Sequence, residues 1–238
     1  HANLTQLGEA AARRLGADMS DVWMPIGPHT HPFLMVTGFY AAMASAGQVV
    51  LAAEGDWLKA VWRGSPSIAT CLASRLPVLS AQLQAESGAV TGLAGRMAGW
   101  AMKTDATGDP NGVVARLKRA LGERYGLPRI RGIVGGRLRT LVAGWGAGDA
   151  MSHGVFGAVG VTVEGSYGLT DSAGLVSISP ADAAAGSVGR PLEGIEVRVA
   201  DDGELLVSGT SVLFAYHGKS PLNTHTLVEG WLSTGDLG

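Results

Sequence analysis

Short apolar runs and helical patterns alternate along the first three quarters of the chain. Residues 3–15 carry the pattern of a helix. Apolar runs bounded by turn residues predict buried strands at residues 22–27, 67–71, 138–143 and 161–164. Because helical stretches separate these runs, we expect an α/β fold, with a parallel sheet and flanking helices.

Residues 33–53 contain no charged residue and are long enough to span a bilayer. Gly47 splits this stretch, and polar residues interrupt it on both sides. We therefore favour a soluble interpretation, with a buried helix over residues 33–45 followed by a buried strand over residues 48–53. A membrane-spanning helix is the alternative.

Further helices are expected between and after the predicted strands. Asp56 stands immediately before one of them, in a position where a carboxylate caps a helix. A polar loop over residues 104–111 separates two others. The expected helices cover residues 57–62, 73–84, 90–103 and 113–124, and a last one ends at residue 159.

The pattern changes after residue 186. Apolar and polar residues then alternate over residues 195–199 and 204–207, and an Asp-Asp-Gly turn at residues 201–203 joins the two runs. This combination predicts a β-hairpin. We therefore divide the chain into an α/β portion, residues 1–185, and the start of a smaller β-rich subdomain, residues 186–238.

Composition limits the classes of function. Hydrophobic residues make up 46% of the 238 residues, which is typical of a globular protein, and the net charge of −2 argues against nucleic acid as a partner. Cys71 is the only cysteine, so no internal disulfide is expected. The single cysteine and the absence of a targeting signature at the N-terminus favour the cytoplasm, and membrane association is left open. The low charged fraction of 16% and the start at His1 suggest a piece of a longer polypeptide that covers part of this surface.

One glycine-rich segment suggests a nicotinamide oxidoreductase. The sequence Gly-Trp-Gly-Ala-Gly at residues 144–148 follows a predicted strand and opens a helix, and Glu164 stands roughly twenty residues further on. However, Asp149 occupies the position of the third glycine in a dinucleotide-binding motif. Its carboxylate would repel a pyrophosphate at the helix N-terminus, so this interpretation is the weaker one.

Three motifs near the end of the chain resemble another class of enzyme. They read GSYGLTD at residues 165–171, GELLVSG at 203–209 and GWLSTGDLG at 230–238. In this order they resemble the YGxTE, GEL…G and GW…TGD motifs of the adenylate-forming (AMP-binding) enzyme superfamily. The sequences HANL at the start, GRLR before the small-residue loop and GRPL at residues 189–192 look most like the long-chain fatty acid–CoA ligases within it.

The resemblance implies a reaction and its partners. The parent protein would react a fatty acid with ATP to form an acyl adenylate, and would then transfer the acyl group to CoA. Mg²⁺ would be its cofactor. Peripheral contact of the parent protein with a membrane is left open. The chain would be an internal fragment of the large N-terminal domain, without the family's phosphate loop and C-terminal domain. Two alternatives remain: a degenerate, non-catalytic module that binds acyl groups or nucleotide, and an adenylate-former that loads a carrier protein.

The same resemblance assigns roles to individual residues. Tyr167 would stack on adenine, Asp236 would accept hydrogen bonds from the ribose hydroxyls, and His31 would lie near the acyl group. Thr170 would donate to the α-phosphate and Asp171 would hold Mg²⁺, so these two are the catalytic candidates. The full nucleotide-binding set is Gly144, Trp145, Gly146, Ala147, Gly165, Ser166, Tyr167, Gly168, Thr170 and Asp236. The simpler readings are a core tyrosine for Tyr167, turn or cap residues for the others, and a polar loop around His31.

The chain departs from the family pattern at identifiable positions. Asp171 replaces a glutamate and is one methylene shorter. Trp145 stands where the family has glycine, and Ala147 where it has proline. The residues Ala73-Ser74 stand in place of a proline–arginine pair.

Overall fold

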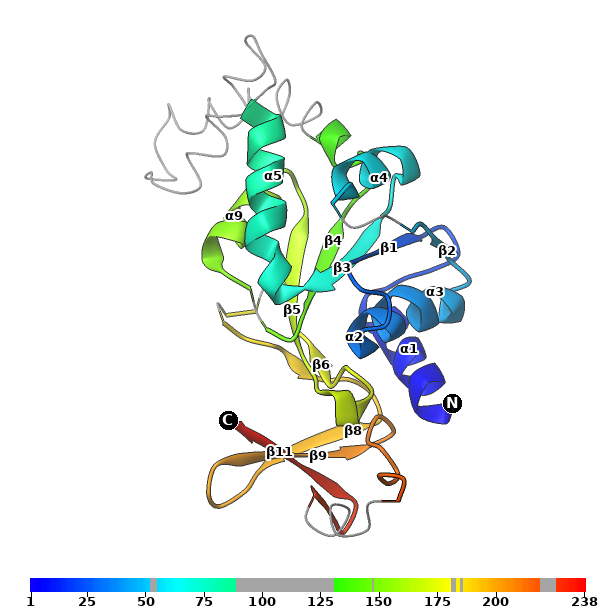
Figure 1. The fold of residues 1–238 in the computed structure, drawn as a ribbon, viewed down its shortest axis with the longest axis vertical. Helices are drawn as coiled ribbons and strands as arrows, with labels where there is room; N and C mark the ends of the chain where they lie inside the picture. Colours follow the sequence, from blue (N-terminus) through cyan, green and yellow to red (C-terminus); the bar gives the residue numbers. More distant parts are fainter. Residues whose placement is uncertain (52–54, 89–130, 147, 181–182, 185, 219–225) are drawn as a thin grey trace.

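The computed structural model describes residues 1–51, 55–88, 131–146, 148–180, 183–184, 186–218 and 226–238 (Figure 1). Its helices are α1 (Ala2–Arg14), α2 (Pro32–Met35), α3 (Ala41–Ala44), α4 (Trp57–Gly64), α5 (Leu76–Gly88) and α9 (Ala150–Ala158). The helices predicted over residues 90–103 and 113–124 and the polar loop between them lie outside the described residues, as does Ala147 of the candidate site.

The described strands form two sheets. The first runs in the order β2 (Gln48–Val49), β1 (Val22–Ile26), β3 (Ile68–Leu72), β4 (Thr140–Gly144), β5 (Thr162–Tyr167), β6 (Ser177–Ile178) and β7 (Arg190–Pro191). Its pairs are parallel from β2 through β5, and β6 and β7 add to it antiparallel. The second sheet is antiparallel, in the order β10 (Leu227–Val228), β11 (Trp231–Leu237), β9 (Glu204–Gly209) and β8 (Ile195–Val199).

This architecture confirms the predicted fold class. Figure 1 shows the parallel sheet with helices on both sides and the small antiparallel sheet below it. The chain passes from β5 through β6 and β7 to β8, the first strand of the small sheet. The predicted hairpin forms from β8 and β9, where Ile195 pairs with Gly209 and Val199 with Leu205. The division into residues 1–185 and 186–238 stays a prediction.

Side-chain alternation along the strands creates two separate cores. In β3, Ile68 faces one core, whereas Ala69 and Cys71 face the other. Neighbouring residues of a strand point to opposite faces of the sheet, so one strand serves both layers. Helices α1, α2 and α3 cover the first face, and α4, α5 and α9 cover the second (Figure 1).

The predicted helix over residues 33–45 is present, but it is not uniform. It begins with α2, continues through a π-helical turn at Val36–Tyr40 and ends with α3. Helix α1 packs closely on this turn because Gly8 has no side chain: a Cβ at Gly8 would lie 2.7 Å from the backbone carbon of Tyr40. Among the described residues no helix combines the length and the apolar character needed to cross a membrane.

The strand predicted over residues 48–53 is not buried in its described part, residues 48–51. Gln48 and Val49 pair with β1 at the edge of the sheet, Val50 N donates to the Trp23 carbonyl at 2.8 Å, and Leu51 is 58% exposed. An edge strand has a neighbour on one side alone, so an apolar run there need not be buried. Asp56 is the N-cap residue of α4, as predicted. Its carboxylate, however, makes no capping hydrogen bond and pairs with Lys59 at 3.0 Å.

An ion pair joins α1 to the middle of the sheet. Arg14 Nη2 lies 3.3 Å from Glu164 Oε2 and donates to the Ser179 carbonyl at 2.6 Å. Glu164 is buried in β5, and this burial raises the pKa of its carboxyl group even though the positive charges of Arg14 and Arg139 oppose the shift. The guanidinium group therefore stabilises a carboxylate that has little access to water.

Removal of that guanidinium should destabilise the fold. We expect Arg14→Ala to lower the free energy of unfolding by about 2–4 kcal/mol, because it leaves Glu164 buried without its partner. The matched control is Arg13→Ala, whose exposed guanidinium group pairs with Glu193 at 3.0 Å and should contribute less than about 1 kcal/mol. Urea denaturation measures both. Equal losses in the two variants would mean that the buried pair has no special weight.

Candidate functional site

The candidate residues gather where β4 and β5 end. These strands are parallel neighbours, with Ala143 opposite Gly165, so the segments that follow them emerge at the same edge of the sheet. Two backbone hydrogen bonds join the segments: Gly146 N donates to Ser166 O at 2.8 Å, and Ser166 N donates to Gly146 O at 3.1 Å. The buried Ser166 hydroxyl donates to the Ala143 carbonyl at 3.0 Å. The two predicted loops therefore form one connected unit.

Small residues in these loops permit close packing. A Cβ at Gly144 would lie 2.2 Å from Cδ1 of Phe33, whose side chain is fully buried. A Cβ at Gly168 would lie 2.4 Å from the Gly174 carbonyl oxygen. Glycine at these two positions is thus required by neighbouring parts of the protein itself.

Trp145 brings the glycine-rich loop against the predicted acyl-site histidine. Its backbone has a left-handed φ of 61°, a conformation that usually favours glycine. The indole Nε1 donates to the Gly174 carbonyl at 3.0 Å, and the ring packs edge-on against His31 with centroids 4.3 Å apart. These two contacts hold a large, 40% exposed side chain in a backbone conformation that is rare for it.

His31 is fixed by its local structure. It is the N-cap residue of α2, and its Nδ1 accepts a hydrogen bond from the Phe33 backbone N–H at 3.3 Å. Partial burial lowers the pKa of this imidazole, which favours the neutral ring. Because Nδ1 is an acceptor, the neutral ring carries its proton on Nε2.

Tyr167 and Asp236 meet although 69 positions separate them in the sequence. Tyr167 ends β5 and donates its hydroxyl to Asp236 Oδ2, on β11, at 2.6 Å. Burial and this bond to a carboxylate raise the pKa of Tyr167 to about 12. The proposed adenine and ribose contacts are therefore neighbours in space.

The GEL and TGD motifs also meet. Gly235 N donates to Glu204 Oε1 at 2.8 Å, and the Thr234 hydroxyl donates to the Leu205 carbonyl at 2.7 Å. Asp236 N donates to Thr234 Oγ1 at 3.1 Å. This network holds the turn that carries Asp236, which fits a structural role for Glu204.

Thr170 and Asp171 lie in a single 3₁₀ turn, Thr170–Ser172, after β5. Thr170 is exposed. The Asp171 carbonyl accepts a hydrogen bond from Leu213 N at 2.8 Å, and its carboxylate accepts one from the Tyr216 hydroxyl. Tyr216 was missed by the motif analysis, because an aromatic residue in a loop gives no signal of its partner.

With these motifs joined in space, comparison with known proteins decides the family. The AMP-binding enzyme family matches residues 1–217. This chain belongs to the AMP-binding enzyme family. It is thus part of the adenylate-forming ligase superfamily, as the motifs predicted.

Relatives include CoA ligases with different acids in their names. A long-chain-fatty-acid–CoA ligase, FadD15 of Mycobacterium bovis, is 39% identical over 129 residues, covering 53% of this chain and 21% of that protein. A 2-succinylbenzoate–CoA ligase of Listeria innocua is 32% identical over 119 residues, covering 47% of this chain and 26% of that protein. The chain therefore matches less than a third of the length of either ligase.

A solved AMP-binding enzyme has the same fold. The o-succinylbenzoate CoA synthetase MenE from Bacillus subtilis, in complex with ATP and magnesium ion, superposes with a TM-score of 0.70 at 19% identity. The superposition covers all of this chain and 43% of that one. At this identity the likeness concerns the fold alone.

The donor groups at the site are compatible with a magnesium ion that arrives with nucleotide. No group of three or more histidine, cysteine or acidic residues lies close enough together within the described residues to hold a metal. Mg²⁺ is commonly bound by one or two carboxylates together with water and substrate phosphates. Asp171, which is only partly buried, has a carboxylate of this kind.

The dinucleotide-binding interpretation does not agree with the structure. Asp149 caps α9, accepting hydrogen bonds from the backbone N–H of Ser152 at 2.8 Å and from its hydroxyl at 2.6 Å. Glu164 lies within β5, paired with Arg14, and not at the end of the strand. The acid expected to hold a ribose is therefore engaged in the core.

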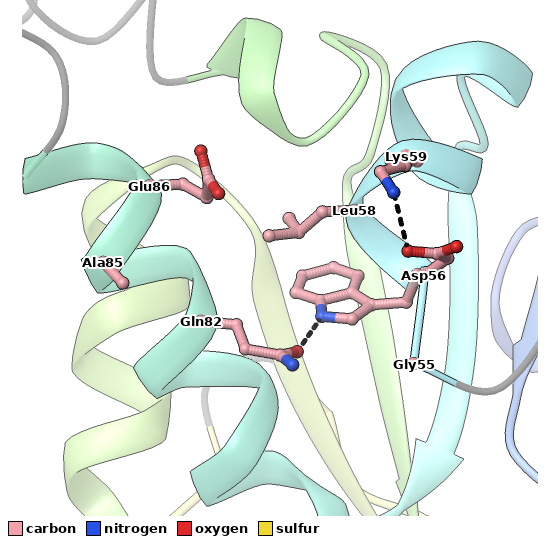
Figure 2. Close-up of a pocket in the computed structure, with 8 residues that line it drawn as sticks. Gly55, Asp56, Leu58, Lys59, Gln82, Ala85 and Glu86 are labelled. Carbon is pink, nitrogen blue, oxygen red and sulfur yellow. Dashed lines mark hydrogen bonds and ion pairs between the residues drawn. The ribbon is translucent and has the colours of Figure 1, made fainter.

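A pocket of about 220 Å³ lies elsewhere, between the start of α4 and the second half of α5 (Figure 2). Across it, Trp57 Nε1 donates to Gln82 Oε1 at 2.6 Å. Helix α5 starts near the carboxyl edge of the sheet and runs back from it (Figure 1). None of the predicted site residues lines this pocket, and its volume is below that of typical ligand sites.

Proposed function

We propose that the protein containing this chain activates a long-chain fatty acid with ATP and transfers the acyl group to CoA. The observation that carries the proposal is the meeting of Tyr167 with Asp236 beside the loops that end β4 and β5. The 39% identity to a long-chain ligase supports the choice of acid.

The first half-reaction explains why these residue types are needed. A carboxylate oxygen of the acid attacks the α-phosphorus, the bond between the α-phosphorus and the bridging oxygen breaks, and pyrophosphate leaves. Because two anions must approach each other, an enzyme accelerates this step by positioning the reactants and by stabilising the developing negative charge. In this proposal Tyr167 stacks on adenine, Asp236 accepts from the ribose, and the exposed Thr170 hydroxyl donates to the α-phosphate.

Asp171 is the residue proposed to hold Mg²⁺. The metal would neutralise phosphate charge as it develops. The rings of His31 and Trp145 pack against each other, and in this proposal the acid approaches beside them. In the second half-reaction the CoA thiol attacks the acyl carbonyl carbon, a thioester forms, and AMP leaves.

The proposal is tested with the longest natural protein that contains this chain. Pyrophosphate release is measured with ATP, Mg²⁺ and either palmitate or 2-succinylbenzoate, and the product formed with CoA is identified by mass spectrometry. We expect release with palmitate and formation of palmitoyl-CoA. Faster release with 2-succinylbenzoate would contradict the long-chain assignment. Release with palmitate but no thioester with CoA would favour a carrier protein as acceptor.

A further inference from the structure

Each of the two carboxylates in the proposed nucleotide site accepts a hydrogen bond from a tyrosine hydroxyl. The bond between Tyr167 and Asp236 joins two residues that the motifs already assign. The bond from Tyr216 to Asp171 is different, because it brings in a residue that no motif assigns. Tyr216 lies in the irregular segment after β9 and is partly buried.

The segment that carries Tyr216 holds Asp171 at two points. Leu213 N donates to the Asp171 carbonyl at 2.8 Å, which fixes the backbone of the 3₁₀ turn against this segment. Three residues later, the Tyr216 hydroxyl donates to Asp171 Oδ2. One contact places the backbone and the other orients the carboxylate, so the side chain loses the freedom to rotate about its two torsions.

The turn is also closed from its other side. Leu169 N donates to the Ser172 hydroxyl at 3.1 Å, and Ser172 N donates to the Leu169 carbonyl at 3.1 Å. These bonds fix the backbone on both sides of Asp171 but leave its carboxylate untouched. Among the described residues, the Tyr216 hydroxyl is the group that orients this carboxylate.

We propose that Tyr216 is the positioning residue for Asp171, holding its short carboxylate in the orientation needed to bind the metal–nucleotide complex. The inference rests on the proposed function and deepens it, since it names a residue of this chain that holds the proposed metal ligand, Asp171, in place. A hydrogen bond to an ionised acceptor is stronger than one between neutral groups, so a single hydroxyl is adequate for this task.

The phenol is suited to remain a donor. Burial, followed by the bond to the Asp171 carboxylate, raises the pKa of Tyr216 to about 12. The hydroxyl therefore keeps its proton at neutral pH.

Equilibrium binding of ATP tests this role independently of catalysis. Affinity is measured by calorimetry with excess Mg²⁺ and with EDTA, in the longest natural protein that contains this chain. We expect Tyr216→Phe to weaken binding of ATP with Mg²⁺ roughly tenfold, and to leave binding in EDTA unchanged. The control is Phe214→Ala, two positions away, which removes a side chain that is 98% exposed and should change neither affinity.

A double-mutant cycle separates positioning from general support of the fold. In an Asp171→Asn background, Tyr216→Phe should have almost no further effect on binding with Mg²⁺, because the carboxylate it orients is gone. An equal loss with Mg²⁺ and in EDTA, an undiminished loss in the Asn background, or a wild type that binds ATP without any help from Mg²⁺ would each overturn the inference. A wild type that binds the Mg²⁺ complex but releases no pyrophosphate would overturn the proposed function instead.

Discussion

Replacement of Asp171 by alanine is expected to lower acyl-adenylate formation by roughly a hundredfold or more. The physical reason is the loss of the carboxylate that would hold Mg²⁺ where negative charge develops on the α-phosphate. The structure places this carboxylate in a turn that is closed on both sides, with Tyr216 bound to it. The measurement is the initial rate of pyrophosphate release with palmitate, ATP and Mg²⁺.

Asp171→Glu is the informative companion variant. It adds one methylene and restores the length of the side chain in the family motif, so activity should be kept or raised. If the wild type releases no pyrophosphate and Asp171→Glu does not restore release, the ligase proposal is wrong. The degenerate binding module would then be the better account of the chain.

Replacement of Asp236 by alanine should weaken ATP binding by about 1.5–3 kcal/mol, because a charge-assisted hydrogen bond to ribose is lost. Calorimetric titration with ATP measures the loss. Asp201→Ala is a matched control, since it removes the same charge from the exposed turn between β8 and β9. Unchanged ATP affinity in Asp236→Ala would remove this residue from the nucleotide site.

The same variant has a second, independent effect. The Asp236 carboxylate contributes to the raised pKa of Tyr167, both by accepting a hydrogen bond from its hydroxyl and by its negative charge. Its removal should lower the pKa of Tyr167 from about 12 toward the ordinary tyrosine value, although burial, the larger cause, remains. A titration of ring-labelled tyrosine by NMR measures this shift. No change in Tyr167 would mean that the two side chains do not interact in solution.

Local pattern alone determined the main elements of the fold. Apolar runs bounded by turn residues predicted β1, β3, β4 and β5, since a strand in the middle of a parallel sheet is buried on both faces whatever its neighbours are. Strict alternation with an Asp-Asp-Gly turn predicted the hairpin of β8 and β9 for a similarly local reason. The order and spacing of the three C-terminal motifs predicted the AMP-binding family, which the comparisons confirmed.

Tertiary structure alone decided whatever depends on a distant neighbour. Residues 48–53 have the apolar character of a buried strand, but β2 lies at the edge of the sheet and Leu51, just after it, is exposed. Glu164 has the residue type of a ribose-binding acid, yet the guanidinium group of Arg14, 150 positions away in the sequence, binds it in the core. In both cases the sequence specified the residue and not its surroundings.

The candidate site divides in the same way. Sequence placed Tyr167, Asp171 and Asp236 in one site, because each belongs to a motif of fixed spacing. It gave no sign that Tyr167 donates to Asp236, that Trp145 packs on His31, or that Tyr216 donates to Asp171. These contacts join residues on separate elements, and only the order of the strands and the paths of the loops after them bring such residues together.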